Sequence, residues 1–327
     1  MNSDARSANR RESQILGYVV LLLPPLLWAG NFIVGRAARG DVPPMMLAFA
    51  RHFVALAFLL PFGWAAMGRE IKRYWKCRWL LVRVSLAGMV AFNLMIYWGL
   101  HNTTASKAQL MNSAIPVLIV LIGAVSINQR LTLAQLFGLF LSCAGVLTII
   151  LHGDLRQLVA LQFSQGDLIV FGGMVSFALF STWLHAFPTD MSRVGLLAAQ
   201  LTVAVVALFP FLVLEYIAGA RATWSMSAFA AMLYVGLAAS LLANLLYMFG
   251  IARVGPTRAG MFIHLVPMYG AILSVTLLGE NLHIYHAVGM LAILAGLAWS
   301  NIAAAICSRS HRNRQQSRDI SGVAKAV

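Results

Sequence analysis

Long apolar runs separated by short polar segments fill almost the whole chain. A run of about 20 apolar residues is long enough for an α-helix to cross the hydrocarbon core of a membrane. Ten such runs predict ten transmembrane helices. The runs in the first half cover residues 15–35, 45–64, 80–100, 108–127 and 133–151. Those in the second half cover residues 167–184, 195–214, 228–249, 259–278 and 284–306.

The composition agrees with an all-α membrane protein. The 327 residues are 60% hydrophobic and 10% charged, and the mean hydropathy is +0.80. Soluble domains carry about 25% charged residues. The short polar segments leave no room for a separate soluble catalytic domain. We expect the first apolar run to be retained as a helix, because it is longer than the core of a signal peptide.

The two halves of the chain repeat each other. Pro116 is followed 151 residues later by Pro267. The same offset separates Asn93/Asn244, Gly99/Gly250, Gln129/Glu280, Gly138/Gly289 and Gly145/Gly296. Nearer the start of each half the offset is 149, as in Trp28/Phe177, Arg51/Gln200 and Pro61/Pro210. Offsets that hold over so many special residues indicate the duplication of a five-helix unit.

The odd number of helices in each unit has a consequence for topology. Five crossings leave the chain on the far side of the membrane, so the second unit is inverted relative to the first. Inverted repeats are typical of secondary transporters, which open a midplane site alternately to each side. The predicted organisation is a cytoplasmic tail (1–14), a first repeat (15–151), an outer linker (152–166), a second repeat (167–306) and a basic cytoplasmic tail (307–327).

The net charge of +14 is distributed unevenly along the chain. If the N-terminus is cytoplasmic, 18 of the 24 Lys and Arg residues fall in cytoplasmic segments. The expected outer loops hold five, namely Arg36, Arg39, Lys107, Arg156 and Arg221. This asymmetry predicts a bacterial-type inner membrane protein with both termini in the cytoplasm. The basic segments are expected to contact anionic lipids, and the pattern argues against a nucleic-acid partner.

Motifs typical of enzymes and metal sites are missing from the sequence. The three cysteines, Cys77, Cys143 and Cys307, are odd in number and none lies in an expected outer loop, which argues against a disulfide framework. The sequence has no CxxC, HExxH or nucleotide-binding motif. We therefore expect no metal, no cofactor, no enzymatic activity and no direct use of ATP.

Two matching stretches carry a family resemblance. They read TTASKAQLMNSAIPVLIVLIGAVSINQRLTLAQLFGLFLSCAGV, from residue 103, and GPTRAGMFIHLVPMYGAILSVTLLGENLHIYHAVGMLAILAG, from residue 255. Both resemble the EamA repeat of the drug/metabolite transporter superfamily, and LLWAGNFIVGR resembles that family's first helix. Gln129 departs from the family, whose first repeat usually has Glu there; Glu280 keeps the acid. We expect this departure to affect packing or capping only.

The resemblance implies that helices 5 and 10 are peripheral and that a cavity lies between helices 1–4 and 6–9. Gly138 and Gly145 share one face of helix 5, as do Gly289 and Gly296 on helix 10. Such faces permit close helix approach. They could serve packing within the chain or a homodimer contact.

Arg51 is the sharpest candidate for a substrate-binding residue. It lies roughly 10 Å along helix 2 from its outer start, and an Arg inside a membrane marks a functional site by default. It could bind a substrate carboxylate through two hydrogen bonds. Alternatively, it snorkels outward or pairs with helix carbonyls. The family often has Arg here, which fits either interpretation.

The other candidate binding residues are polar or aromatic. Asn31, Asn93, Asn112, Gln200 and Asn244 each need a hydrogen-bond partner in hydrocarbon, so they line a wet cavity or join helices. The aromatic candidates Trp28, Tyr97 and Tyr247, with Trp98, form either a wall for an amphipathic substrate or ordinary core. Tyr97 and Trp98 could also be interface belt residues.

Pro116 and Pro267 interrupt equivalent helices, and such matched breaks indicate hinges or static kinks. His264 and His52 could carry a proton, although a structural role is the simpler interpretation. All ten Asp and Glu residues fall in tails, loops or helix ends. A carboxylate relay at mid-membrane is therefore not expected, which predicts gradient-driven movement or weak coupling through His264.

These patterns predict a secondary transporter of the inner membrane that moves small metabolites, with amino acids as the first expectation. The family resemblance favours export over import. Two other classes remain as alternatives. One is a membrane sensor or assembly subunit that has lost transport, and the other is a membrane-embedded enzyme acting on a lipid-linked substrate. The second would need a nucleophile, a metal cluster or paired carboxylates, none of which is visible.

Overall fold

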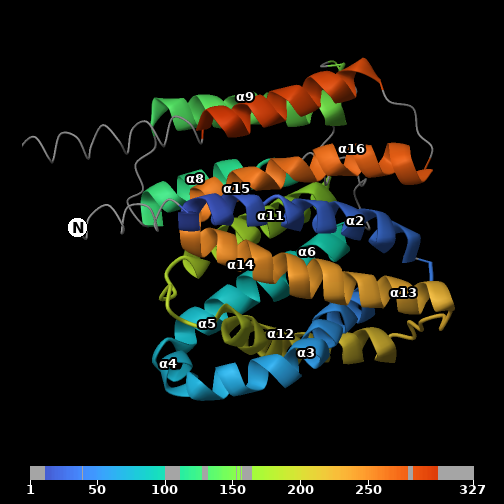
Figure 1. Cartoon of the computed structure of the whole chain (residues 1–327). Coiled ribbons are helices and arrows are strands. Elements are labelled where there is room, and N and C mark those ends of the chain that lie inside the picture. Colours follow the sequence, from blue (N-terminus) through green and yellow to red (C-terminus); the bar gives the residue numbers. More distant parts are fainter. Residues whose placement is uncertain are drawn as a thin grey trace, which may run out of the picture.

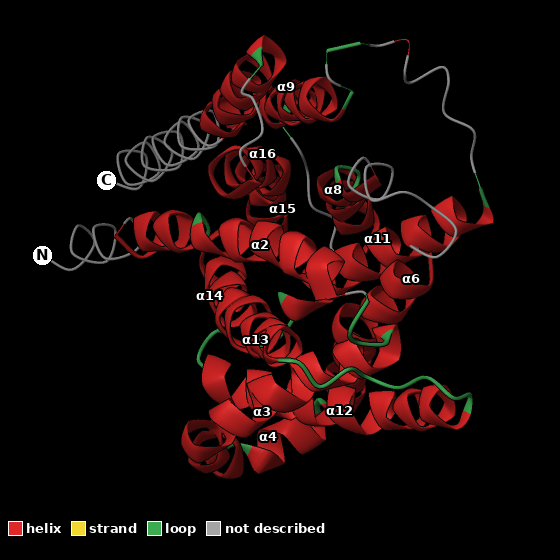
Figure 2. Cartoon of the chain, turned by 90° about the vertical axis from the view of Figure 1, so that its right-hand side faces the viewer, coloured by secondary structure: helices red, strands yellow, loops and turns green. Residues whose placement is uncertain are grey.

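The computed structural model describes residues 12–38, 40–99, 111–126, 132–151, 153–154, 156, 164–278 and 283–300. All regular structure in these residues is helical (Figures 1 and 2). Seven described helices are long and apolar enough to cross a membrane. The shorter apolar helices Ile115–Ser126 and Ile284–Ser300, with the interrupted segment 256–278, account for the other three predicted spans. The predicted all-α membrane fold is confirmed.

The first repeat contains spans one to five. The first span is the apolar helix Glu12–Asn31, which overlaps α2 (Leu23–Ala38), and the second is α3 (Pro44–Arg69). A short helix, α4 (Ile71–Lys76), leads into the third span, which consists of α5 (Arg78–Ser85), η1 (Leu86–Ala91) and α6 (Phe92–Gly99). The fourth and fifth spans are α8 (Ile115–Ser126) and α9 (Leu133–Ile150).

The second repeat follows the same order. Spans six and seven are α11 (Gln165–Leu184) and α12 (Arg193–Ile217). The eighth span joins α13 (Met226–Tyr234), η2 (Val235–Leu242) and α14 (Ala243–Val254). The ninth joins α15 (Pro256–Met261), η3 (Phe262–His264) and α16 (Leu265–Leu278), and the tenth is Ile284–Ser300. The tails, most of the linker 152–166, and Gln129, Glu280 and Cys307 lie outside the described residues.

The glycine faces of the fifth and tenth spans pack against each other within one chain. A Cβ placed on Gly138 would lie 2.6 Å from the carbonyl oxygen of Gly296, and one placed on Gly145 would lie 2.6 Å from that of Gly289. The two helices run together at one edge of the bundle (Figure 1). Because backbone meets backbone at these positions, the structure assigns both glycine faces to internal packing.

The second and seventh spans, α3 and α12, form an antiparallel pair that is capped at both ends. The Glu70 carboxylate accepts hydrogen bonds from the backbone N–H of Ser192, at 3.1 and 3.2 Å, just before α12 begins. At the other end, Glu215 accepts bonds from the N–H groups of Met45 and Met46, at 3.0 and 2.8 Å. A carboxylate at a helix N-terminus accepts hydrogen bonds from N–H groups that have no partner within the helix, and its negative charge interacts favourably with the positive end of the helix dipole. Each repeat thus caps a helix of the other.

Both the third and the eighth spans contain a π-helical segment. η1 has 6 residues and η2 has 8. The segments start 149 positions apart, at Leu86 and Val235, and the α-helices after them start 151 positions apart, at Phe92 and Ala243. The two extra residues of the second repeat are therefore taken up within η2. π-Segments inside α-helices are frequently found at functional sites.

The π-segments also join the repeats crosswise. The Ser176 hydroxyl of α11 donates to the carbonyl of Ala87 in η1, at 2.9 Å. Reciprocally, the Trp28 indole N–H of α2 donates to the carbonyl of Ala239 in η2, at 3.1 Å. The first helix of each repeat is thus fixed to the π-segment of the other.

Gly145→Ala is predicted to destabilise the protein, because the added methyl group meets backbone atoms that cannot move aside. The expected loss is about 1–3 kcal/mol of folding free energy, seen as a lower unfolding temperature of the purified protein in detergent. Gly68→Ala is the matched control, since nothing lies within 4 Å of a Cβ at that helical position. Equal unfolding temperatures for the two variants would contradict the close packing.

Candidate functional site

A buried arginine connects three spans from both repeats. Arg51, on α3, is almost fully buried. Its Nε donates to Ser240 Oγ of η2 at 2.7 Å, and its Nη1 donates to Asn93 Oδ1 of α6 at 2.8 Å. The side chain therefore points into the bundle, so the outward-snorkelling interpretation is wrong. Hydrogen bonds to a charged group are the strong kind, and they offset part of the cost of burying the guanidinium.

The repeat mates Asn93 and Asn244 share one local arrangement. Asn93 Nδ2 donates to the carbonyl of Met89 at 2.7 Å, and Asn244 Nδ2 donates to the carbonyl of Ser240 at 2.8 Å. Each amide thus bonds four residues back, into the end of the preceding π-segment. The Asn93 oxygen then faces Arg51, so this residue both supports its own helix and belongs to the polar cluster.

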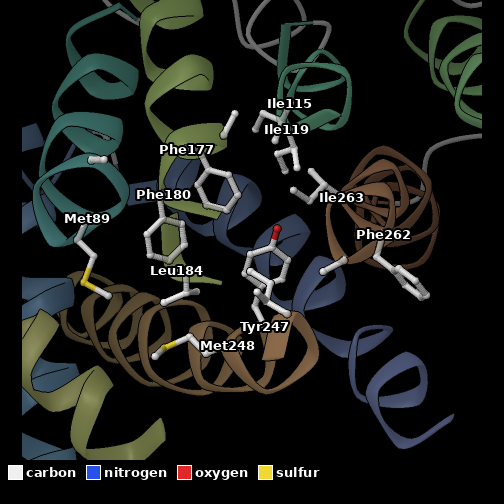
Figure 3. Packing of buried hydrophobic residues seen from close by; sticks show 14 of the residues in the cluster. Met89, Ile115, Ile119, Phe177, Phe180, Leu184, Tyr247, Met248, Phe262 and Ile263 are labelled. Carbon is white, nitrogen blue, oxygen red and sulfur yellow. The ribbon is translucent and has the colours of Figure 1, made fainter. Parts of the chain in front are cut away.

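An aromatic cluster lies beside the polar one. The Trp28 ring packs edge-on against Phe177 and Tyr247, with ring centroids 5.8 and 5.2 Å away. Phe177 also contacts Phe92 and Phe180, at 5.0 and 5.4 Å. Figure 3 shows Tyr247 between Phe177 and the side chains of the ninth span. Because Trp28 bonds to Ala239 and Arg51 to Ser240, the two clusters meet at neighbouring residues of η2.

Gln200, the repeat mate of Arg51, stands in contrast to it. It is fully buried in α12, and neither its Nε2 nor its Oε1 has a hydrogen-bond partner among the described residues. Arg51 and Gln200 occupy equivalent positions in the two repeats. Of the two, Arg51 is the one that bonds to Ser240. A buried amide without partners costs roughly 1–3 kcal/mol, which marks Gln200 as a candidate contact for a bound molecule.

The remaining predicted binding residues lie apart from this cluster. Asn31 is half-buried on α2, and its buried Oδ1 has no partner among the described residues. Asn112 is buried just before α8. Tyr97 belongs to α6, but its side chain is outside the described part of the structure. Trp98 is 64% exposed, which fits an interface belt and removes it from any central wall.

The helix interruptions in the fourth and ninth spans touch each other. A turn precedes α8, and a 3₁₀ turn precedes α16. Pro116 therefore lies in the first turn of α8 and Pro267 in the first turn of α16, where proline is tolerated. His264 Nε2 lies 3.1 Å from the carbonyl oxygen of its own repeat mate, Ser113. Contact between repeat mates means that the pseudo-twofold axis passes between these two breaks.

Both candidate histidines are buried and hydrogen-bonded. His264 Nδ1 lies 2.7 Å from Ser142 Oγ on α9, which ties the broken ninth span to the peripheral pair. His52 Nδ1 donates to the carbonyl of Ala48 at 2.7 Å, within its own helix. The described Asp and Glu residues all lie in connections or near helix ends, so within this part of the chain no carboxylate faces Arg51.

The fold is that of a multi-pass membrane protein built from two repeats of five spans. The family model of the EamA-like transporter family matches residues 15–151 and 164–302. The chain belongs to this family, and the resemblance drawn from its sequence is confirmed.

Curated relatives match over most of the chain. An uncharacterized transporter of Archaeoglobus fulgidus is 25% identical, covering 86% of this chain and 95% of the relative. A probable amino-acid metabolite efflux pump of Escherichia coli is 24% identical (85% and 92%). A probable terminal-alkyne amino-acid exporter of Streptantibioticus cattleyicolor is 25% identical (80% and 84%). A solved crystal structure with 18% identity and a TM-score of 0.71, covering 90% of this chain and 99% of that one, shares the fold.

Sequence reasoning missed Ser240, whose hydroxyl oxygen accepts a hydrogen bond from Arg51 Nε at 2.7 Å. A serine within an apolar helix is common and gives no signal by itself. The change of repeat offset from 149 to 151 was the available clue, because it marks an irregular segment between the second span and Asn244. η2, with Ser240 inside it, is that segment.

Ser240→Ala is predicted to lower stability more than Ser85→Ala. Both serines are fully buried, but the Ser85 hydroxyl bonds only to the Leu81 carbonyl of its own helix. Ser240→Ala removes an acceptor from a buried guanidinium, worth about 1.5–3 kcal/mol. Thermal unfolding of both purified variants in detergent measures the difference. A Ser240→Ala loss no larger than that of Ser85→Ala would contradict the role of this bond.

Proposed function

We propose that this protein is a secondary transporter that exports small amino-acid-like metabolites by alternating access. It would reside in a bacterial-type inner membrane with both termini in the cytoplasm, the tails 1–14 and 307–327 inside and the linker 152–166 outside. The export direction is supported by the Escherichia coli and Streptantibioticus cattleyicolor relatives, which are described as a probable efflux pump and a probable exporter. The orientation is supported by the distribution of Lys and Arg along the sequence.

The observation that carries the substrate class is the buried, cationic Arg51. Two of its donors, Nε and Nη1, are engaged by the neutral acceptors Ser240 and Asn93. A substrate carboxylate could replace both, because its two oxygens match the guanidinium fork. Exchanging neutral partners for an anion turns a costly buried charge into a stable pair. The same side chains that bind the substrate would hold the three spans together before it binds.

The surroundings of Arg51 fit the rest of such a substrate. Trp28, Phe177 and Tyr247 offer apolar ring surface next to the guanidinium site. Asn244, whose amide bonds to the carbonyl of Ser240, adds an amide group from the second repeat that could contact an ammonium or hydroxyl group. Gln200 stays in the proposal as a more distant residue, because its level on α12 is opposite Gly63 rather than Arg51. A molecule with a carboxylate, a polar group and an apolar side chain would match this combination. Asn31, Asn112, His264 and Tyr97 stay in the proposal as more distant lining residues.

The matched breaks at Pro116 and Pro267 are the proposed hinges. They adjoin each other at Ser113 and His264, on the pseudo-twofold axis. A helix interrupted before its proline has lost regular hydrogen bonds there, so bending at that point costs less than elsewhere. Small rotations about the two breaks would move the halves of the fourth and ninth spans in opposite directions, as alternating access requires.

Arg51→Gln is predicted to abolish export while the protein still reaches the membrane. The substitution keeps a polar side chain but removes the charge that binds the carboxylate. The measurement is metabolite profiling of growth medium from cells that express each variant at matched membrane levels. Arg156→Gln is the control, since the Arg156 side chain is 92% exposed and pairs with Asp154. Wild type and Arg156→Gln should accumulate one metabolite class outside the cells.

Two outcomes would count against this proposal. Normal export by Arg51→Gln would remove Arg51 from the binding site. Identical media from wild-type and empty cells, followed by no uptake of labelled amino acids into vesicles, would leave a sensor or assembly role as the function.

Flux is predicted to follow the substrate gradient without a proton relay through a carboxylate. Labelled-substrate flux in proteoliposomes should therefore be the same with and without an imposed pH gradient, or depend on that gradient only through His264. His52→Ala serves as the comparison, because this histidine bonds within its own helix. Uphill, proton-driven transport that survives both His264→Ala and His52→Ala would contradict the prediction.

A further inference from the structure

A row of exposed apolar side chains marks the connection between the second and third spans. Ile71, Trp75 and Trp79 are 55%, 70% and 72% exposed, and they follow each other at intervals of four residues through α4 and the start of α5. Ile71 and Trp75, spaced by four, share one face of α4, and Trp79 follows at the start of α5, after the break at Cys77. We call these three side chains, together with the neighbouring basic residues, the α4–α5 patch. It lies at the end of the bundle where the described chain begins (Figure 1).

Basic residues surround this row. The exposed ones between residues 69 and 83 are Arg69, Lys72, Lys76, Arg78 and Arg83. Glu70 is the single acidic residue of this segment. Its carboxylate is turned into the protein, where it accepts bonds from the Ser192 N–H and from the Tyr74 hydroxyl at 2.9 Å. The outer surface of the α4–α5 patch is therefore cationic and aromatic.

Hydrogen bonds join the patch to the second repeat. Tyr74 is buried beneath α4. Arg73 Nη2 donates to both carboxylate oxygens of Asp190 at 2.9 Å, which joins α4 to the connection between α11 and α12. The hydrogen bond from the Arg73 guanidinium lowers the pKa of Asp190 below its ordinary value. The backbone of the patch is thereby connected to both repeats.

Arg78 lies between the two exposed indoles. Its guanidinium carbon is 5.3 Å from the Trp75 ring centroid and 5.8 Å from that of Trp79. Tryptophan favours the boundary between headgroups and acyl chains, and Arg and Lys attract the phosphates of anionic lipids. A helix with an apolar face and flanking cations lies in the membrane interface.

We propose that the α4–α5 patch is a binding site for an anionic phospholipid. Arg78, Lys72 and Lys76 would contact the headgroup phosphate, and Ile71, Trp75 and Trp79 would pack against the upper acyl chains. The site is independent of the transport path, because none of these side chains takes part in the Arg51 cluster.

Native mass spectrometry of the detergent-purified protein tests this site. Phosphatidylglycerol and phosphatidylcholine with the same acyl chains are added in competition. Wild type should retain phosphatidylglycerol preferentially. Each charge removed among Lys72→Gln, Lys76→Gln and Arg78→Gln should weaken that preference by about fivefold. Arg221→Gln is the control, because Arg221 also stacks on an aromatic ring, Tyr216 at 3.8 Å, but lies outside the patch. An unchanged preference in the triple variant would overturn the proposal.

Footprinting of the wild-type protein gives a second test that needs no substitution. Hydroxyl radicals oxidise exposed indoles, and Trp224, 61% exposed in the connection before α13, is an internal reference. Adding phosphatidylglycerol, compared with phosphatidylcholine, should protect Trp75 and Trp79 and leave Trp224 unchanged. Equal protection by inorganic phosphate would show that an anion alone occupies the site. Equal protection of all three indoles would show general lipid coating. Either result would overturn a specific lipid site.

Discussion

The hydrogen bonding of one buried cation is the constraint on which the centre of this structure depends. A guanidinium inside a membrane bundle needs hydrogen-bond acceptors from the protein, because the hydrocarbon offers none. Arg51 obtains these acceptors from Asn93 and Ser240, which lie on different repeats. The second, third and eighth spans are thereby fixed relative to one another at the point where the two halves of the duplication meet.

The duplication supplies the frame that makes this junction possible. Glu70 of the first repeat and Glu215 of the second each cap a helix of the other repeat. A side chain of each repeat, Trp28 or Ser176, donates a hydrogen bond to the π-segment of the other. The axis of the repeat is visible where Ser113 meets His264. The two repeats differ at one equivalent position, where the first has the cationic Arg51 and the second has the neutral amide Gln200. We therefore expect the substrate to bind at Arg51, where the repeats differ.

Much of the fold could be predicted from the sequence, because hydropathy and repeat offset are properties of the sequence itself. Ten apolar runs and two repeats follow from them, whereas the burial of Arg51 does not, because the sequence is equally consistent with a side chain that snorkels outward. The partners of Arg51 could not be predicted, because Ser240 faces it only through the irregular turns of η2. Which helix the Gly138 face meets also depends on tertiary packing. The proposed contacts of Gln200 and Asn31 stay predictions, since a bound molecule would have to supply them.

The central claim is that Arg51 recognises a carboxylate between the repeats. Competition against transport of a labelled amino acid, by an unlabelled amino acid and by its carboxamide, tests this claim most directly. Wild type should be inhibited far more strongly by the acid, and a variant with residual flux, such as Arg51→Lys, should keep part of that preference. Equal inhibition of the wild-type protein by acid and carboxamide would contradict the account.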